Sequence, residues 1–276
     1  MNLRAFGGGE LTGEKLVRYA FFDEAGVGSM KDDPNATVVG AIVHCDTQLK
    51  PLETFLADLR QIYIPASHRD GFIFHATEMF SRKGPVFGDT SLISDDQIKK
   101  IIEAFMSIPE RFGLPLVVDS TPKEHAAKAM GLENSSVADK TLHAHGSAFF
   151  ACVFTVERWM REHAPSEYCQ LVIENNDHAR KTFDRTNKLL CDDRAEELLG
   201  ASKIDVVGKY LPMRHIRKTP LFEEKSADSV LTLVDFCAYV FSKHAKALEN
   251  PKMGEHPIFT PLAERLVQNV FLPWVE

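Results

Sequence analysis

The chain lacks any apolar run approaching the ~20 residues that a membrane-spanning helix needs. Its first 15 residues contain no apolar core of the kind found in signal peptides. Cysteines are few, and the five that occur, at positions 45, 152, 169, 191 and 237, form no CxxC pair. Neither a disulfide framework nor a zinc knuckle is therefore predicted, and we expect reduced thiols in a cytoplasmic protein.

Several common catalytic motifs are also absent. No HExxH, P-loop, GxSxG or dinucleotide-binding glycine pattern is present. The formal net charge is −7, which argues against a protein that coats nucleic acid with a generally basic surface. A local basic groove is compatible with this total, because an acidic active site would itself contribute to the negative charge.

The patterns that are present indicate an α/β fold. Residues 17–22 and 37–45 are predicted strands joined by a short turn-rich link, which favours an antiparallel hairpin. Helical and strand patterns then alternate with no internal repeat and no shift in composition. We predict a flexible lead-in over residues 1–15 and one α/β domain over 16–276, with a mixed sheet flanked by helices.

The remaining elements follow from periodicity and capping signals. A helix is expected to begin after Ser94, with Gln97 completing a capping box. The other predicted helices span residues 49–63, 139–162, 180–199, 226–248 and 261–270. The other predicted strands or extended segments span residues 71–78, 114–119, 168–173, 204–207 and 214–217.

Carboxylates lie at places from which they can converge. Asp23 and Glu24 end the first strand, and Glu174 and Asp177 follow the strand at 168–173. Strand ends are where α/β sheets present their sites. Converging carboxylates repel one another and need a counter-charge, and ligation by oxygen alone suits Mg²⁺ or Mn²⁺.

The last predicted helix is apolar almost all round. One stripe at helical spacing consists of Val230, Leu233, Val234, Cys237 and Phe241, and the opposite face carries Asp228, Thr232, Asp235 and Tyr239. Asp235 is flanked by two apolar residues in a stretch expected to be buried. A lone buried carboxylate is costly, so a metal ion or a cationic partner is expected beside it.

Each acidic residue also has a simpler interpretation. The carboxylates after the first strand can begin a loop, and those after the strand at 168–173 can form a turn and a helix cap. Asp235 can pair with an arginine or lysine of the core. His75 and Glu78, within GFIFHATE, can be a strand end and a cap.

Basic residues gather in two segments. Lys181 and Arg185 follow the second acidic cluster, and Arg214 and Arg217 precede the last helix. A phosphate backbone would need such charges near the carboxylates. Solvated helix faces explain either cluster taken singly.

Taken in order, these motifs resemble a bacterial and phage family, the domain of unknown function numbered 3800. The resemblance covers about residues 17–248. It is carried by Asp23-Glu24-Ala25-Gly26, with alanine where the family has serine, by VVGAIV, by His75-Ala-Thr-Glu78, by Glu174 at a strand end, and by LTLVDFCAY, with Val234 in place of alanine and Asp235 as the acid.

The resemblance implies a ribonuclease H-like fold, in which the first strand, the fourth strand and the final helix supply metal-binding carboxylates. Carried over, these are Asp23, Glu174 and Asp235. Further candidate ligands are Glu24, Glu78, Asp177 and Asp228, and His75 is a candidate for proton transfer. Residues 46–113 would elaborate the minimal core. The expected function is a nuclease that uses one or two Mg²⁺ or Mn²⁺ ions to hydrolyse phosphodiester bonds of DNA or RNA.

Two other functions stay open at this point. One is an inert module of the same fold that binds nucleic acid or a protein partner, and the net charge favours a protein. The other is a metal-dependent hydrolase of a small phosphorylated substrate, which would use a closed pocket rather than an open groove.

Overall fold

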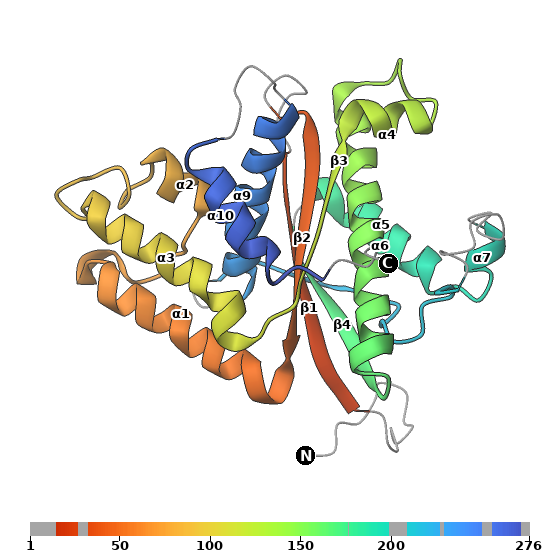
Figure 1. Ribbon diagram of the computed structural model, residues 1–276, viewed down its shortest axis with the longest axis horizontal. Helices are drawn as coiled ribbons and strands as arrows, with labels where there is room; N and C mark the ends of the chain where they lie inside the picture. Colours follow the sequence, from red (N-terminus) through yellow and green to blue (C-terminus); the bar gives the residue numbers. More distant parts are fainter. Residues whose placement is uncertain are drawn as a thin grey trace.

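The computed structural model describes residues 15–26, 33–175, 177–198, 209–226, 229–249 and 256–271. Nearly all of the predicted lead-in and the whole predicted strand at 204–207 lie outside these ranges. The described strands form one five-stranded sheet in the order β3-β2-β1-β4-β5 (Figure 1). They are β1 (Lys15–Ala25), β2 (Asn35–His44), β3 (Leu116–Pro122), β4 (Glu167–Glu174) and β5 (Leu221–Glu223).

The sheet is mixed in the manner that the sequence predicted. β1 pairs antiparallel with β2, and β2 pairs antiparallel with β3. On its other edge β1 pairs parallel with β4, which in turn pairs parallel with β5. The predicted antiparallel hairpin and the predicted mixed sheet, with antiparallel strands first and parallel strands afterwards, are thus confirmed.

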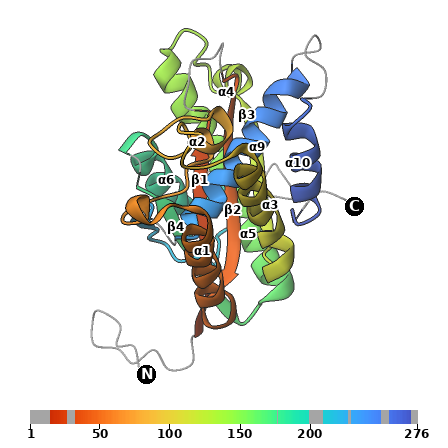
Figure 2. The ribbon, with the colours of Figure 1, turned by 90° about the vertical axis from the view of Figure 1, so that its left-hand side faces the viewer.

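Helices cover both faces of the sheet, as Figures 1 and 2 show from two directions. On one face lie α1 (Lys50–Tyr63), α2 (Ala76–Ser81), α3 (Asp95–Phe112), α9 (Leu231–Glu249) and α10 (Phe259–Val267). On the other lie α4 (Lys123–Ala129), α5 (Val137–His163), α6 (Asp177–Leu190) and α7 (Ala195–Leu198). A π-helical turn (Cys45–Leu49) and a 3-10 turn (Ala66–His68) flank α1.

Alternation along β1 divides its side chains between two cores. Phe21 belongs to the core beneath α9, and Phe22 belongs to the core beneath α5. Because successive residues of a strand point to opposite faces, Asp23 lies on the α9 side and Glu24 on the α5 side. The first strand therefore delivers one of its two terminal carboxylates, not both, to the face that carries α9.

Gly40 of β2 is required by close packing between the strands. It pairs with Phe22, and a Cβ atom at Gly40 would collide with the Phe22 ring and lie 2.8 Å from Cγ2 of Val117. The glycine of the VVGAIV segment thus makes room for an aromatic ring in the α5 core.

The predicted capping box of α3 is confirmed, because Ser94 and Gln97 cap each other reciprocally. Several other predicted elements differ from the structure. The extended segment at 71–78 is wrong from Ala76 onward, where α2 begins. The helix at 180–199 is broken after Leu190, and residues 214–217 contribute a single bridge, Cys169 to Ile216, instead of a strand. β5 was not predicted.

The structure also bears on the cysteines and on membranes. All five cysteines lie in the described ranges, and no disulfide joins any two of them. No helix within those ranges combines the length and the hydropathy that crossing a bilayer would require.

Candidate metal centre

Three carboxylates from distant parts of the chain surround one ammonium group. Nζ of Lys225 lies 3.0 Å from Oδ2 of Asp23, 3.2 Å from Oε1 of Glu174 and 3.3 Å from Oδ1 of Asp235. The Lys225 side chain is 7% exposed. The three carboxylates that the resemblance singled out are therefore brought together, and a cation occupies the space between them.

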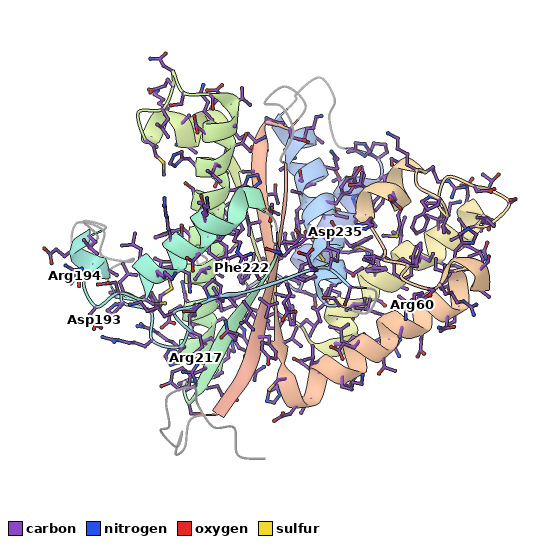
Figure 3. All side chains as sticks on the ribbon, turned by 180° about the vertical axis from the view of Figure 1, so that it is seen from behind. Arg60, Asp193, Arg194, Arg217, Phe222 and Asp235 are labelled. Atoms are coloured by element: carbon purple, nitrogen blue, oxygen red, sulfur yellow. The ribbon has the colours of Figure 1, made fainter. Side chains whose placement is uncertain are left out.

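The fold explains how they meet. Asp23 ends β1 and Glu174 ends β4, and these strands are parallel neighbours, so their carboxyl ends lie at the same edge of the sheet. Asp235 comes from α9, which packs across β1 and β2. Lys225 follows β5, whose Glu223 pairs with Glu174. Figure 3 shows Asp235 on α9 and Phe222 of β5 on opposite sides of the strands.

Asp23 is the most deeply enclosed of the three. Its side chain is 2% exposed, and its Oδ1 accepts a 2.7 Å hydrogen bond from the backbone N–H of Glu24. Burial raises the pKa of Asp23 well above its ordinary value. The positive charge of Lys225 opposes this rise in pKa, and the negative charge of Asp235 adds to it.

The pKa of Glu174 is shifted in the opposite direction to that of Asp23. Burial alone would raise the pKa of Glu174, but the hydrogen bond with Asp23 and the charge of Lys225 outweigh it, so the pKa is lowered. The pKa of Lys225 is raised: burial alone would lower it, and the three carboxylates overcome that effect. The two carboxyls thus have pKa values shifted in opposite directions, and the more buried of them, Asp23, has the raised pKa.

Asp235 also joins α9 to α2. Its Oδ2 accepts a 2.9 Å hydrogen bond from the backbone N–H of Ala76, the first residue of α2. The Asp235 side chain is 22% exposed, so the helix around it is buried as predicted but the carboxylate itself reaches the surface. The predicted cationic partner of Asp235 is Lys225.

His75 and Glu78 lie at the start of α2, and their side chains differ in what they interact with. His75 is close enough to lower the pKa of Glu174 by its charge. The carboxylate of Glu78 instead packs against Gly84, where an added Cβ would collide with it. Gly84 has a φ of 80°, so the turn after α2 both needs a glycine and holds the Glu78 side chain.

The remaining candidate ligands are less central. Glu24 lies on the α5 side of the sheet, opposite to Asp23. Asp177 begins α6, and its side chain is not among those described. Asp228 lies outside the described residues.

The basic candidates fall into two separate places. Lys181 and Arg185 are exposed on α6. Arg214 binds Asp193 at 3.0 Å, and the Arg217 guanidinium lies 4.8 Å from the centre of the Tyr168 ring. Arg217 lies near the lower end of β4 in Figure 3.

The distance along β4 separates the second pair from the carboxylates. The segment that carries Arg214 and Arg217 bridges to Cys169, five residues before Glu174. Five strand residues span about 16 Å. Lys181 and Arg185, by contrast, lie on α6, the helix that follows Glu174 in the chain.

Two cavities flank the sheet edge near the cluster. A cavity of about 520 Å³ lies on the α9 side, lined among others by Tyr19, Phe21, Glu53, Glu223 and Ser226. Tyr19 and Phe21 share the strand face of Asp23, so this cavity lies on the same side of the sheet as that carboxylate.

The second cavity, of about 460 Å³, lies between α6 and β5. Its lining includes Arg180, Lys181 and Phe222, with the Arg180 guanidinium 5.0 Å from the centre of the Phe222 ring. Arg180 also donates a 3.0 Å hydrogen bond to Oδ1 of Asn175, the residue after Glu174. We call this cavity the α6–β5 groove.

The donor set fits a divalent cation of the magnesium type. It consists of carboxylate oxygens alone, which Mg²⁺ and Mn²⁺ prefer. The same oxygens already surround a positive charge, the Lys225 ammonium.

A second group, His44, Cys45 and Asp46, is also closely spaced. There the His44 Nδ1 accepts the Asp46 N–H, and burial raises the pKa of the Cys45 thiol, so these residues form a capped turn.

Lys225 is a residue of the carboxylate cluster that the sequence analysis did not predict. It sits in FEEKSAD, a charged stretch that resembles an exposed loop. The usable signal was indirect: three converging carboxylates demand a counter-charge, and Lys225 is the last lysine before the helix that carries Asp235.

No family model matches the chain, so membership of family 3800 stays a prediction. No curated protein sequence matches it either. Among solved structures, the crystal structure of Bst-RNase HIII in complex with Mn²⁺ is similar with a TM-score of 0.42 and 16% identity. The match covers 93% of this chain and 63% of that chain.

Proposed function

We propose that the protein is a divalent-metal-dependent hydrolase of phosphodiester bonds in nucleic acid. The observation that carries this proposal is the convergence of Asp23, Glu174 and Asp235 around a single cationic position. The carboxylates come from β1, β4 and α9, and assembling them by folding is costly unless a cation compensates the charge.

Asp23, Glu174 and Asp235 would hold the ion. When bound, an ion of this kind activates water and stabilises negative charge on phosphate oxygens. The backbone N–H of Ala76 fixes the orientation of Asp235, and the N–H of Glu24 fixes that of Asp23. His75, whose charge lowers the pKa of Glu174, is our candidate for moving a proton during the reaction.

The α6–β5 groove is our candidate path for the substrate backbone. Lys181 and Arg180 supply positive charge there, and Phe222 offers an aromatic face. Basic side chains beside an aromatic ring suit a single-stranded nucleic acid, because phosphates pair with the charges and bases stack on the ring. Asn175 links this groove to the end of β4.

Calorimetric titration with Mn²⁺ tests the metal site directly. We expect stoichiometric binding to the wild type and none to Asp23→Ala. Asp96→Ala is the matched control, because Asp96 pairs with Lys99 on the exposed side of α3. Absence of binding to the wild type, with and without an oligonucleotide, would leave an inert module as the better interpretation.

Cleavage assays then test the substrate class. Labelled single-stranded and double-stranded DNA and RNA are incubated with Mn²⁺ or with a chelator. We expect cleavage that needs Mn²⁺ and is lost in Asp23→Ala.

A small phosphorylated substrate is the second candidate. The cavity on the α9 side, at about 520 Å³, lies within the range of about 300–1,000 Å³ typical of small-molecule sites. Hydrolysis of a dinucleotide or nucleotide, together with inactivity on polymers, would favour this candidate over the nuclease.

A further inference from the structure

Lys225 is held at the centre of the carboxylates by the strand before it. β5 pairs with β4 up to Glu223, and the carbonyl of Glu223 accepts a 2.8 Å hydrogen bond from the N–H of Asn175. The Glu224 carboxylate accepts a second bond, at 2.6 Å, from the Asn175 side chain. The backbone beside Lys225 is therefore anchored to the residue that follows Glu174.

The ammonium group lies between the three carboxylates that would hold a divalent ion. All three carboxylates lie within 3.3 Å of Nζ. Mg²⁺ binds oxygen at about 2.0–2.1 Å, a shorter distance than those around the ammonium. Two cations in one buried cage repel strongly, so both cannot occupy it together.

We propose that Lys225 is a built-in counter-cation, which occupies the metal position in the metal-free protein and withdraws when a divalent ion enters. The proposal rests on the metal site of the proposed function. The neighbouring cavity of about 520 Å³ gives the ammonium a place to go, because Glu223 and Ser226, on either side of Lys225, line it together with Glu53.

This arrangement makes metal binding a competition. The apparent dissociation constant equals the intrinsic one divided by the fraction of molecules whose site is open. If Lys225 leaves the cage in about one molecule in ten, removal of its charge should tighten metal binding about tenfold. The same removal leaves three carboxylates facing one another, so the metal-free protein should lose stability.

Lys225→Met tests the proposal by two readouts that do not depend on catalysis. Calorimetry with Mn²⁺ should give an affinity about tenfold or more above that of the wild type. Thermal unfolding in the presence of a chelator should give a lower midpoint than that of the wild type. Lys225→Arg keeps the positive charge and should show neither change in full.

Lys188→Met is the matched control. Lys188 pairs with Asp184 on the exposed side of α6, so its removal should alter neither the Mn²⁺ affinity nor the metal-free midpoint strongly. If Lys225→Met does not fold, ¹⁵N NMR of the lysine ammonium groups replaces it. The Lys225 signal, assigned by its absence from Lys225→Arg, should shift when Mg²⁺ saturates the wild type.

The outcomes separate this proposal from the proposed function. Equal Mn²⁺ affinities in wild type and Lys225→Met, or an ammonium signal unmoved by Mg²⁺, would overturn the role of Lys225 and leave the metal site intact. No Mn²⁺ binding to either protein would remove the metal site and, with it, both proposals.

Discussion

At the scale of single residues, Asp235 serves two partners. One oxygen faces Lys225 and the other accepts the Ala76 N–H. Asp235→Asn keeps the side-chain shape and one oxygen acceptor but removes the charge, and two carboxylates still pair with Lys225. We expect metal-dependent cleavage to fall more than about 100-fold, beyond the range for residues that only orient a ligand, while the thermal midpoint is kept or raised.

The control for Asp235→Asn is Asp96→Asn, at the exposed pair with Lys99 on α3. It should cleave at the wild-type rate. Cleavage by Asp235→Asn at the wild-type rate would show that Asp235 is a helix-capping residue and not a metal ligand.

Asp119 of β3 provides a pH test away from the carboxylate cluster. Burial raises the pKa of Asp119, although a 2.7 Å hydrogen bond from Thr121 opposes the rise. The folded state therefore holds its proton to a higher pH than the unfolded state, and the wild type loses stability as pH rises from about 3.9 through the folded pKa. Asp119→Asn carries no titrating group at this position and does not lose this stability. We therefore expect its free energy of unfolding in urea, relative to that of the wild type, to increase above about pH 4 and then to level off.

Asp192→Asn provides a comparison, because the pKa of Asp192 is shifted in the opposite direction to that of Asp119. The hydrogen bond from the Arg194 N–H lowers the pKa of Asp192, so this carboxylate contributes stability above its ordinary pKa and loses it as pH falls through the lowered value. At neutral pH the wild type should thus have a larger free energy of unfolding than Asp192→Asn. A stability difference for Asp119→Asn that does not vary with pH would contradict the assigned shift.

At the scale of elements, local patterns predicted what local interactions determine. The capping box at Ser94 is confirmed because both of its partners lie within one helical turn. α2 was missed because its first N–H is capped by Asp235, 159 residues away, and His75 makes no side-chain cap. β5 was missed because three residues carry no periodicity and their pairing with β4 is long-range. The ends of the predicted strands indicated where the carboxylates lie, whereas the position of Lys225 depends on β5, which was not predicted.

Gly40 tests how tightly the two central strands pack. In Gly40→Ala the new methyl group must displace the Phe22 ring or the Val117 side chain. Overpacking of this kind costs about 1–3 kcal/mol, which we expect as a lower urea midpoint with an unchanged slope. In Phe22→Leu the ring is gone, so adding Gly40→Ala to that background should cost less. Full additivity in this double-mutant cycle would mean that the ring is not the obstacle.

At the scale of the whole molecule, the proposed nuclease is an acidic protein, so binding of an acidic polymer would need a confined basic surface. The net charge is −7, so general attraction to nucleic acid is weak and, under the proposed function, the α6–β5 groove would supply the favourable contacts. Lys181 is exposed there. Each phosphate contact on a single strand contributes about 0.7 to the slope of log affinity against log salt concentration.

Lys181→Ala should therefore weaken the binding of a single-stranded oligonucleotide and reduce the magnitude of that slope by about 0.7. The measurement uses fluorescence anisotropy at several salt concentrations, in the Asp235→Asn background to prevent cleavage. Arg214→Ala is the control, since Arg214 is held by Asp193 and its segment pairs near the opposite end of β4. If Arg214→Ala reduces the slope and Lys181→Ala does not, the substrate runs along the other end of the sheet, and its scissile bond would reach the carboxylates only by crossing about 16 Å of β4.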